Sequence, residues 1–387
     1  NIVSLANALV SWSTCTEPGD EAAGMLREAL GAERSLAMVL EGSASRLTVA
    51  LEASGYADQA TSRFGDVTRV LDDSLQRWLP RLRNFDAGLL VSLLESGKQP
   101  WLHNQSENWP TRLADLGWGE PAMLWVSGSI ESVGELERSI AVVGSRSSTS
   151  YGEYVANELV GCLADSGYAV VSGGAMGIDG VAHRCALAAG ATTVAVMAGG
   201  VDRLYPSANR GLLLEITNKG ALVSELPPGA SPTKWRFLQR NRLIAAMSQA
   251  TVVIEAGWRS GSMNTASHAQ NLNREVGAFP GPVTSPASAG CHRLIREKKA
   301  ELVCSGADVL ELVTGSSALF DLPSSYSIGQ LEQRALDALS DKRSAVSSIA
   351  ARAGLTLGEA QMALASLQLD SLAEGSYEGW RKTGSNL

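Results

Sequence analysis

Three glycine-rich turns carry the residue types that bind an anion. They are Gly144–Arg146, Ser172–Gly177 and Ser260–Thr265, and each follows an apolar stretch that we expect to be a strand. Backbone N–H groups, a hydroxyl and a guanidinium at the start of a helix hold an anionic oxygen favourably. Three such turns after successive strands predict one phosphate-binding face. The candidates that they supply are Ser145, Arg146, Gly173, Gly174, Ser260, Gly261 and Ser262.

A second group of candidates combines cations with aromatic rings. The run Lys234–Phe237 precedes a predicted helix that opens with Arg240, Asn241 and Arg242. Ammonium and guanidinium groups hold phosphates while a ring stacks on a base, so this spacing favours a single-stranded nucleic acid. The residue that stacks stays open between Trp235 and Phe237, because one of the two rings is expected to fill the core.

The charge distribution supports an anionic partner although the whole chain is acidic. The 387 residues carry a net charge of −8. Within residues 227–274, six basic side chains stand against Glu255 alone, which gives this segment a charge of +5. Such asymmetry focuses a positive field on one surface, here beside the glycine-rich turns.

The sequence lacks the motifs of dinucleotide-binding oxidoreductases, of P-loop nucleotide hydrolases and of hydrolases with a catalytic triad or paired carboxylates. The Gly144–Arg146 turn is not G-x-G-x-x-G, and no acidic residue closes the strand Ala169–Ser172 to hold a ribose. The Walker pattern is absent, and so is any Ser/His/Asp or paired-carboxylate arrangement with credible spacing. We therefore expect no enzymatic activity, no cofactor and no catalytic residue.

Three titratable residues need separate consideration. Asp179 and His183 lie four residues apart and share one face of a helix, as an acid/base pair or two metal ligands would. We favour a structural role for both, in which they orient the turn before them. Glu255 ends a predicted strand, and we expect it to anchor nearby backbone or arginines.

Length and composition place the chain among multidomain proteins of a reducing compartment. A single ordinary core does not accommodate 387 residues, so two or three domains are expected. The five cysteines are scattered without a C-x-x-C pair, which argues against a zinc site or disulfides. No apolar run is long enough to cross a bilayer and no signal-peptide pattern opens the chain, so we expect a cytoplasmic protein. A start at Asn1 suggests that the natural N-terminus is missing or replaced.

Strand and helix patterns alternate through the middle of the chain, which predicts a mostly parallel sheet with helices on both faces. The predicted strands are Ala122–Val126, Ser139–Val143, Ala169–Ser172, Thr192–Ala198, Ala221–Glu225, Thr251–Glu255, Glu275–Phe279 and Ala300–Val303. The predicted helices between them are Tyr151–Ser166, Gly180–Ala189, Asn209–Lys219, Arg240–Met247 and Asn264–Asn273.

The two ends of the chain have different patterns. Residues 1–65 are predicted to form a helical N-terminal domain, followed by a 66–314 domain whose core is 139–303. Residues 315–326 are predicted to be a linker. Three helical patterns followed by a predicted hairpin at 371–380 suggest a winged helix-turn-helix in 327–387. Because basic residues are sparse there, we favour a protein-contact or regulatory module over a duplex-binding one.

As a set, these motifs resemble the DNA-processing protein A family. The resemblance covers residues 139–303 by order and spacing, with a lead-in segment from Trp109 to Gly128 and a C-terminal winged-helix module at 327–380. The residues that carry it are Val142–Arg146, Ser172–Asp179, Ala182-His183, Leu204–Pro206, Ser224-Glu225, Arg240–Arg242, Glu255-Ala256, Ser260–Ser262, Thr265-Ala266 and Pro280-Gly281.

The resemblance implies an extended Rossmann-like domain that binds single-stranded DNA without sequence preference. Members of the family protect incoming strands and help to load the recombinase RecA during natural transformation, usually as dimers. By motif, Arg146 holds a phosphate beside Ser145, with backbone contacts from Gly173 and Gly174. Lys234 and either Arg240 or Arg242 line the same pocket, Phe237 stacks on a base, and Ser260–Ser262 complete the floor.

One enzyme class shares a related fold and similar turns. It is the lysine-decarboxylase-like group of nucleotide hydrolases that activates cytokinin, and it is expected to carry Pro-Gly-Gly-x-Gly-Thr before a catalytic Glu. The corresponding segment here, Glu255–Ser262, lacks the Pro-Gly-Gly. Membership of this enzyme class is therefore the alternative to a non-enzymatic DNA-binding protein.

Overall fold

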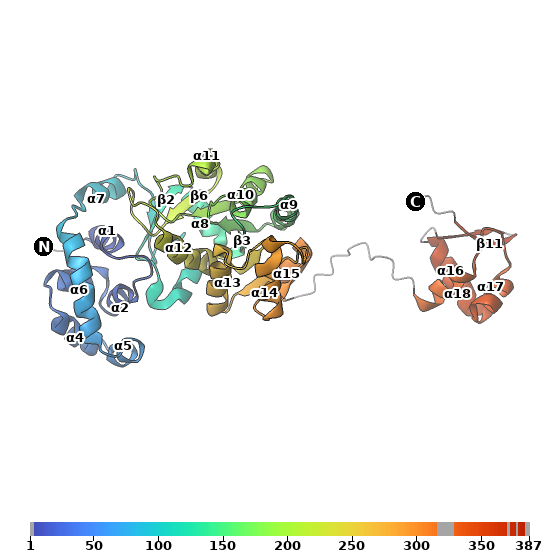
Figure 1. Ribbon diagram of the computed structural model, residues 1–387, viewed down its shortest axis with the longest axis horizontal. Helices are drawn as coiled ribbons and strands as arrows, with labels where there is room; N and C mark the ends of the chain where they lie inside the picture. The colour runs from blue at the N-terminus through green and yellow to red at the C-terminus, as the bar shows by residue number, and fades with distance from the viewer. Residues whose placement is uncertain (1–3, 316–328, 370–371, 377, 384–387) are drawn as a thin grey trace. The chain divides into compact units, whose positions relative to one another are not determined.

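The computed structural model of the chain describes residues 4–315, 329–369, 372–376 and 378–383. The chain forms two compact units, Asn1–Ala318 and Leu319–Leu387. The first unit holds a group of N-terminal helices and a large sheet covered by helices, and the second holds three helices and a small sheet (Figure 1).

Seven helices form the N-terminal part of the first unit. Asp20, Ser43 and Asp66 begin three of them by accepting a hydrogen bond from a backbone N–H of the first turn. Trp12 and Trp78 meet edge to face in the shared core, with ring centroids 5.4 Å apart. The helices are α1 (Leu5–Cys15), α2 (Glu21–Leu30), α3 (Ala32–Leu40), α4 (Ala44–Ala53), α5 (Ala57–Phe64), α6 (Val67–Arg83) and α7 (Gly88–Glu95).

Within the described residues, nine strands form one sheet in the order β1-β2-β6-β5-β4-β3-β7-β8-β9. The pairings from β6 to β9 are parallel, whereas β1 and β2 join one edge in antiparallel fashion. This confirms the predicted α/β, Rossmann-like, mostly parallel sheet. The strands are β1 (Trp101–Leu102), β2 (Leu124–Gly128), β3 (Ser139–Val143), β4 (Ala169–Ser172), β5 (Thr193–Val196), β6 (Ala221–Ser224), β7 (Ala250–Val253), β8 (Glu275–Ala278) and β9 (Glu301–Leu302).

Helices cover both faces of this sheet, and the central strand shows why. Along β3, Ala141 and Val143 pack into the core beneath α12 (Lys234–Met247), α13 (Gly261–Asn271) and α14 (Ala289–Arg296). Ile140 and Val142 point to the opposite core, beneath α9 (Ser150–Asp165), α10 (Ile178–Ala188) and α15 (Gly306–Thr314). A strand buried on both faces is apolar at nearly every position, as is typical of parallel sheets.

Two further helices are α8 (Ile130–Gly134) and α11 (Arg210–Lys219), and short 3-10 helices occupy Thr111–Gly119, Glu135–Arg138, Ser207–Asn209 and Pro286–Ser288.

The strand order reverses between β3 and β7. From β3 the chain proceeds outward through β4, β5 and β6, and it then returns to pair β7 with the other side of β3. At such a switch point the loops that follow the two strands diverge and leave a crevice beyond their carboxyl ends. The turn at Gly144 follows β3 and the loop at Gly257 follows β7, so both border this crevice.

Helix α12 begins earlier than the sequence predicts. The apolar pattern predicted a start at Arg240, but the helix begins at Lys234 because the Thr233 side chain accepts a hydrogen bond from the N–H of Arg236. The run of cations and aromatics therefore lies on a helix and not on a loop. This distributes its side chains over different faces.

The second unit contains α16 (Gln330–Ala338), α17 (Val346–Ala353) and α18 (Leu357–Leu369), followed by the antiparallel pair β10 (Ala373–Ser376) and β11 (Gly379–Lys382). Gly354 ends α17 with a φ of 63°, which permits the short turn into α18. The assignment as a winged helix stays a prediction. Residues 316–326 of the predicted linker, and Ser371 and Tyr377 of the predicted hairpin, lie outside the described residues.

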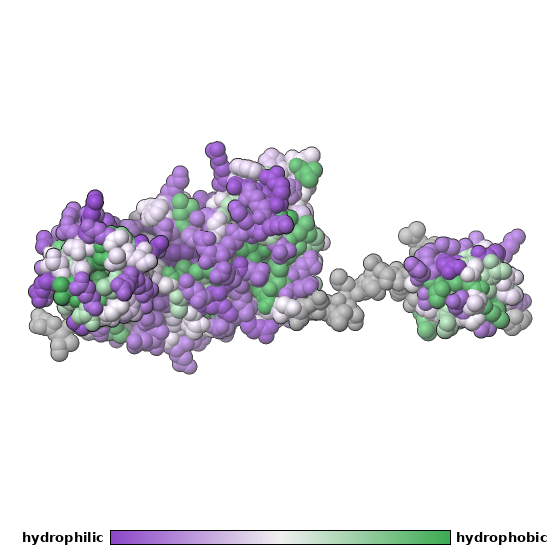
Figure 2. Space-filling model, turned by 90° about the horizontal axis from the view of Figure 1, so that it is seen from below, coloured by the Kyte–Doolittle hydropathy of each residue, from purple (hydrophilic) through white to green (hydrophobic). Residues whose placement is uncertain are grey.

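The surface of the first unit is mostly hydrophilic on the face turned to the viewer in Figure 2, with apolar residues in smaller patches. No helix among the described residues is long and apolar enough to cross a membrane.

Candidate nucleic-acid interface

A groove of about 810 Å³ lies at the switch point of the sheet. It is built from the loops after β3 and β7, the first turns of α12 and the N-terminus of α13. Nine of the predicted site residues line it: Ser145, Arg146, Lys234, Phe237, Arg240, Asn241, Ser260, Gly261 and Ser262. Gly173, Gly174 and Arg242 are not among its described lining residues.

The Gly144–Arg146 turn is fixed by its own backbone. The Ser145 hydroxyl donates to the carbonyl of Ser147 at 2.9 Å and accepts from the N–H of Ser147 at 3.2 Å. The carbonyl of Ser145 also accepts from the N–H of Ile178 at 3.1 Å. Gly177 permits this approach, since an added Cβ would lie 2.2 Å from that carbonyl oxygen and its φ is +75°. Arg146 is left exposed at the edge of the groove.

An aromatic and cationic stack stands beside this turn. The guanidinium of Arg146 lies 5.1 Å from the ring centroid of Phe237. The ring centroids of Tyr205 and Phe237 lie 5.7 Å apart. Cation–π contact of this kind orients a guanidinium without neutralising it. Trp235 is 57 % exposed and lies outside the lining of the groove, so the geometry favours Phe237 as the ring that a base would contact.

Arg240 is buried behind the groove and organises the ends of two strands. Its guanidinium donates to the carbonyl of Gly173 at 2.9 Å and to the carbonyl of Val196. Burial lowers the pKa of Arg240 to about 10, partly offset by the charge of Asp179. An added Cβ at Gly173 would lie 2.5 Å from the Arg240 guanidinium, so this glycine makes room for the arginine. Gly173 thus contributes through Arg240 and not through the groove surface.

Asn241 and Arg242 point in different directions from the same helix. The Asn241 amide donates to the side-chain oxygen of Asn264 at 3.1 Å and to the carbonyl of Gly261 at 3.4 Å, which holds the start of α13 against α12. Arg242 forms a buried ion pair with Glu225 at 2.6 Å. Residues i and i+2 of a helix do not share a face, which separates Arg242 from Arg240.

The third glycine-rich turn begins α13. Ser260 precedes the first turn, and its hydroxyl accepts from the N–H of Ser262 at 3.4 Å and lies 2.8 Å from the Ser262 hydroxyl. The N-terminus of α13 therefore presents hydroxyls and backbone N–H groups at the groove, an arrangement that suits an anionic oxygen.

Asp179 and His183 are buried beneath the second turn. Burial raises the pKa of Asp179, opposed by Arg240, and its carboxylate accepts from the N–H of Gly173 at 3.2 Å. Burial lowers the pKa of His183 to about 3, and its Nδ1 lies 2.8 Å from the Thr193 hydroxyl. Both side chains are thus engaged with the fold. Among the described residues, no group of three or more His, Cys, Asp and Glu side chains is placed to hold a metal ion.

Glu255 closes the N-terminus of α9. Its carboxylate accepts from the N–H of Thr149 at 3.0 Å and from the Thr149 hydroxyl at 2.5 Å. An added Cβ at Gly152 would lie 2.2 Å from a carboxylate oxygen, so the carboxylate sits against the first turn of the helix. The expected anchoring role of Glu255 matches this placement, and the carboxylate supplies the anion that a helix N-terminus favours.

The cations at the groove have no carboxylate partner in the part of the chain that the structure describes. Arg146, Lys234 and Arg259 are exposed and form no ion pair there. Of the described lining residues, only Asp179 is acidic, and it is buried. The groove is therefore a cationic surface with an aromatic ring at one side.

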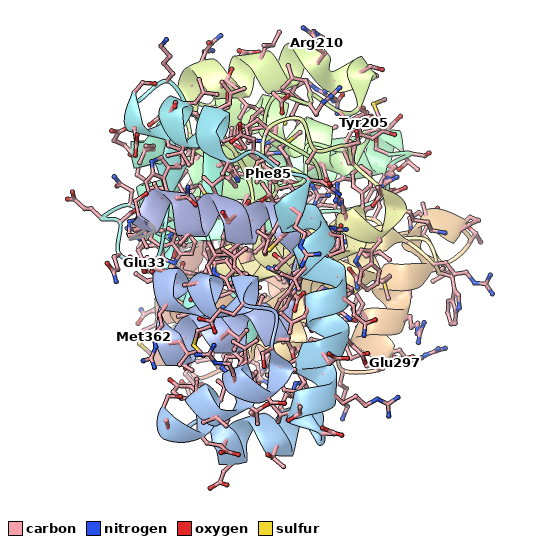
Figure 3. All side chains as sticks on the ribbon, turned by 90° about the vertical axis from the view of Figure 1, so that its left-hand side faces the viewer. Glu33, Phe85, Tyr205, Arg210, Glu297 and Met362 are labelled. Atoms are coloured by element: carbon pink, nitrogen blue, oxygen red, sulfur yellow. The ribbon has the colours of Figure 1, made fainter. Side chains whose placement is uncertain are left out.

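Tyr205 and Arg259 are among the lining residues that were not predicted as site residues. Tyr205 was present in the Leu204–Pro206 motif and Arg259 in the basic segment, but neither carries a local pattern that assigns it to a site. Figure 3 labels Tyr205, which lies in the loop region between β5 and α11.

A Rossmann-like sheet with a cationic groove at its switch point is typical of a broad class of nucleotide- and nucleic-acid-binding proteins. Within that class, the model of the DNA recombination-mediator protein A family matches residues 101–314 of this chain. The chain belongs to that family.

Individual relatives agree with this assignment. A putative DNA processing protein DprA of Mycobacterium tuberculosis is 45 % identical over 267 residues, which cover 67 % of this chain and 68 % of the relative. The X-ray structure of DNA processing protein A from Streptococcus pneumoniae superposes with a TM-score of 0.62 at 29 % identity, covering 79 % of this chain and 97 % of that one. A structure of DNA processing protein A from Helicobacter pylori, described as giving insight into its single-stranded DNA binding mode, has a TM-score of 0.50 at 28 % identity and covers 55 % and 94 %.

Proposed function

We propose that this protein binds single-stranded DNA without sequence preference in the groove at the switch point. The observation that carries the proposal is the combination of three cations without carboxylate partners among the described residues, Arg146, Lys234 and Arg259, with the half-buried ring of Phe237. Cations that track phosphates and a ring that stacks on any base favour a single strand over a duplex. The single-stranded DNA binding mode described for the Helicobacter pylori relative supports the proposal.

A non-enzymatic role fits this groove better than hydrolysis of a nucleotide. The cytokinin-activating group is expected to carry its catalytic Glu after the segment that corresponds to Glu255–Ser262, and residues 263–274 contain no acidic residue. Glu255 itself is 2 % exposed and bonded to Thr149. Asp179, the acidic residue of the described lining, is bonded to backbone behind the groove. Neither carboxylate is placed to act as a general acid or base on a ligand in the groove.

The cellular role follows from the family. We propose that the protein protects the bound strand and promotes the loading of RecA during DNA uptake, natural transformation and recombination. The description of the family as a recombination mediator supports this role. In this proposal the protein acts as a homodimer in the cytoplasm without a membrane partner.

Fluorescence anisotropy with labelled oligo-dT and with duplex, repeated over a series of salt concentrations, tests the proposal. We expect tight binding to oligo-dT that weakens steeply with salt, because phosphate contacts release counterions. We expect weaker binding to duplex of the same length. Indifference to single strands, or release of a free base from nucleoside monophosphates, would contradict the proposal.

A further inference from the structure

Two arginines of helix α12 do not contribute to the groove. Lys234, Phe237 and Asn241 line the groove, whereas Arg236 and Arg242 of the same helix do not. Arg236 instead pairs with Glu17, in the loop between α1 and α2, and Arg242 pairs with Glu225, which contacts the same loop. Figure 1 shows α12 on the side of the sheet that faces α1 and α2.

Arg236 is held by a carboxylate from the loop between α1 and α2. The Arg236 guanidinium donates twice to Glu17, at 3.0 and 2.9 Å, and once to the carbonyl of Ser231 at 2.9 Å. Glu17 also accepts from Arg81 of α6 at 2.8 Å. Burial raises the pKa of Glu17, but the hydrogen bonds from Arg236 and Arg81 outweigh it and lower the pKa overall. Glu17 therefore connects the longest N-terminal helix with the first turn of α12.

Arg242, six residues after Arg236, makes a second connection between α12 and the loop that carries Glu17. Its guanidinium pairs with Glu225, and the Glu225 carboxylate also lies 3.5 Å from the N–H of Gly19, in the loop that carries Glu17. Gly19 has a φ of +77°, and an added Cβ would lie 3.0 Å from the Arg242 Nε. The Ser13 hydroxyl donates to the carbonyl of Glu225 at 3.0 Å. The loop 16–20 thus packs closely against α12 at two points about 1.7 helical turns apart.

We infer that the N-terminal helices set the position of the DNA-binding face of α12 through Glu17, which is a positioning residue for strand binding. This inference rests on the proposed function of the groove. Glu17 contacts Arg236, and the residue after Arg236 is Phe237, whose ring packs against Arg146. Release of the first turn of α12 therefore displaces Lys234 and Phe237 together.

The sign of the expected effect separates positioning from simple electrostatics. Glu17 is an acidic residue near a cationic groove, so the loss of its charge alone strengthens the attraction for a polyanion. Loss of its hydrogen bonds to Arg236 frees α12 and weakens binding. Glu17→Gln removes the charge and the ion pair together, and the two explanations predict opposite changes in affinity.

The test is a titration of oligo-dT with full-length wild-type, Glu17→Gln, Glu17→Asp and Glu21→Gln proteins. Glu21 forms an exposed ion pair with Arg63 at 2.7 Å, so Glu21→Gln removes the same charge from the N-terminal helices without contact to α12. We expect Glu17→Gln to bind about three- to tenfold more weakly than wild type, which lies in the lower part of the range of coupling between residues in contact. Glu17→Asp keeps the charge but shortens the side chain, and we expect an intermediate loss. Glu21→Gln should bind at least as tightly as wild type.

Two further readouts identify the origin of a loss. The slope of log affinity against log salt should become shallower by at most about 0.7 in the Glu17 variants, because Lys234 is the phosphate-contacting side chain that the displaced turn carries. Hydrogen exchange should become faster in the 234–247 segment, while exchange in the strands stays as in wild type. Equal or tighter binding by both Glu17 variants, with wild type still binding, overturns the inference and leaves the proposed function intact. Failure of the wild type to bind oligo-dT overturns the proposed function itself.

Discussion

The groove of the first unit and the small second unit both carry arginines, but they engage them differently. In the second unit, Arg343 and Arg381 both pair with Glu374 at 2.7 Å, and Arg334 donates to the carbonyl of Ala353 at 3.0 Å. In the groove, Arg146 lies over an aromatic ring and has no carboxylate partner among the described residues. A guanidinium that is already paired has little left to offer a phosphate. Arg343 and Arg381 are therefore poorer contacts for a polyanion than Arg146, whereas Lys342, Arg352 and Lys382 of the second unit form no ion pair among the described residues either.

The largest expected effect is the loss of two groove cations. Arg146→Ala combined with Lys234→Ala should weaken binding of oligo-dT by about 3 to 6 kcal/mol, because charge-assisted hydrogen bonds contribute about 1.5 to 3 kcal/mol each. The slope of log affinity against log salt should become shallower by about 1.4, since each phosphate contact with a single strand contributes about 0.7. A salt titration by anisotropy measures both quantities. Unchanged affinity would place the strand elsewhere on the protein.

The next effect distinguishes the two aromatic residues of α12. Phe237→Ala should weaken binding by about 1 to 3 kcal/mol, the contribution of one base stacked on a ring, with no change in the salt slope. Trp235→Ala should bind as wild type, because Trp235 does not line the groove. Titrations of both variants at one salt concentration decide between them. A larger loss for Trp235→Ala than for Phe237→Ala would reverse the assignment.

The third prediction concerns acid sensitivity, which should differ between the two units. His183 has a pKa of about 3 in the folded first unit and an ordinary value near 6.5 when unfolded, so the unfolded state binds more protons between these values. Stability of the first unit should therefore fall as the pH drops below 6.5, by about 2 kcal/mol at pH 5 from this residue. The second unit contains no histidine. Hydrogen bonds from Arg381 and Arg343 lower the pKa of Glu374 in this unit. The stability that these ion pairs contribute is therefore lost only as the pH falls through the lowered pKa of Glu374.

Urea unfolding at pH 7 and pH 5, followed by tryptophan fluorescence, checks this difference. Eight of the nine tryptophans precede residue 316, so the signal reports mainly on the first unit. His183→Gln should flatten the pH dependence of that transition. An equally steep dependence in the variant would assign the acid sensitivity to other groups.

The smallest expected effect belongs to the second unit. Arg343→Gln and Arg381→Gln should change the affinity for oligo-dT and for duplex by less than about twofold, because these side chains are paired within the unit. The same anisotropy titration serves as the measurement. A loss comparable to that of the groove variant would make the second unit a DNA-binding surface and abolish the contrast between the regions.

Much of the fold could be predicted because its signals are local. The apolar run Ser139–Val143 and the turn after it gave the bounds of β3 without error, since a strand buried on both faces is apolar at nearly every position. The start of α12 was predicted at Arg240, six residues late, because the run of cations and rings before it has no apolar periodicity. Short α14 was not predicted, since its eight residues follow a stretch rich in Ser, Pro and Gly.

The site was predictable as a set of motifs but not as a set of roles. Arg240 and Arg242 were equivalent candidates in the sequence, and only the helical geometry of α12 separates them. The function of Gly173 depends on Arg240, which lies 67 residues further along the chain. Tyr205 reaches the groove from a loop, where no periodicity marks which way a side chain points. Each of these roles follows from tertiary contacts that no short segment encodes.

The carboxylate at the start of α9 bears on how the protein distinguishes a polymer from its monomer. In dinucleotide-binding folds the N-terminus of the helix after the first parallel strand receives a phosphate. Here the Glu255 carboxylate binds Thr149 at the start of α9. The phosphate of a free nucleotide therefore has to compete with this carboxylate for the N-terminus of the helix. In the function that we propose, a strand instead engages several cations of the groove at once, and each linked phosphate raises the effective concentration of the next. The preference for DNA over free nucleotides then depends on the number of phosphates that one ligand molecule carries in a single chain.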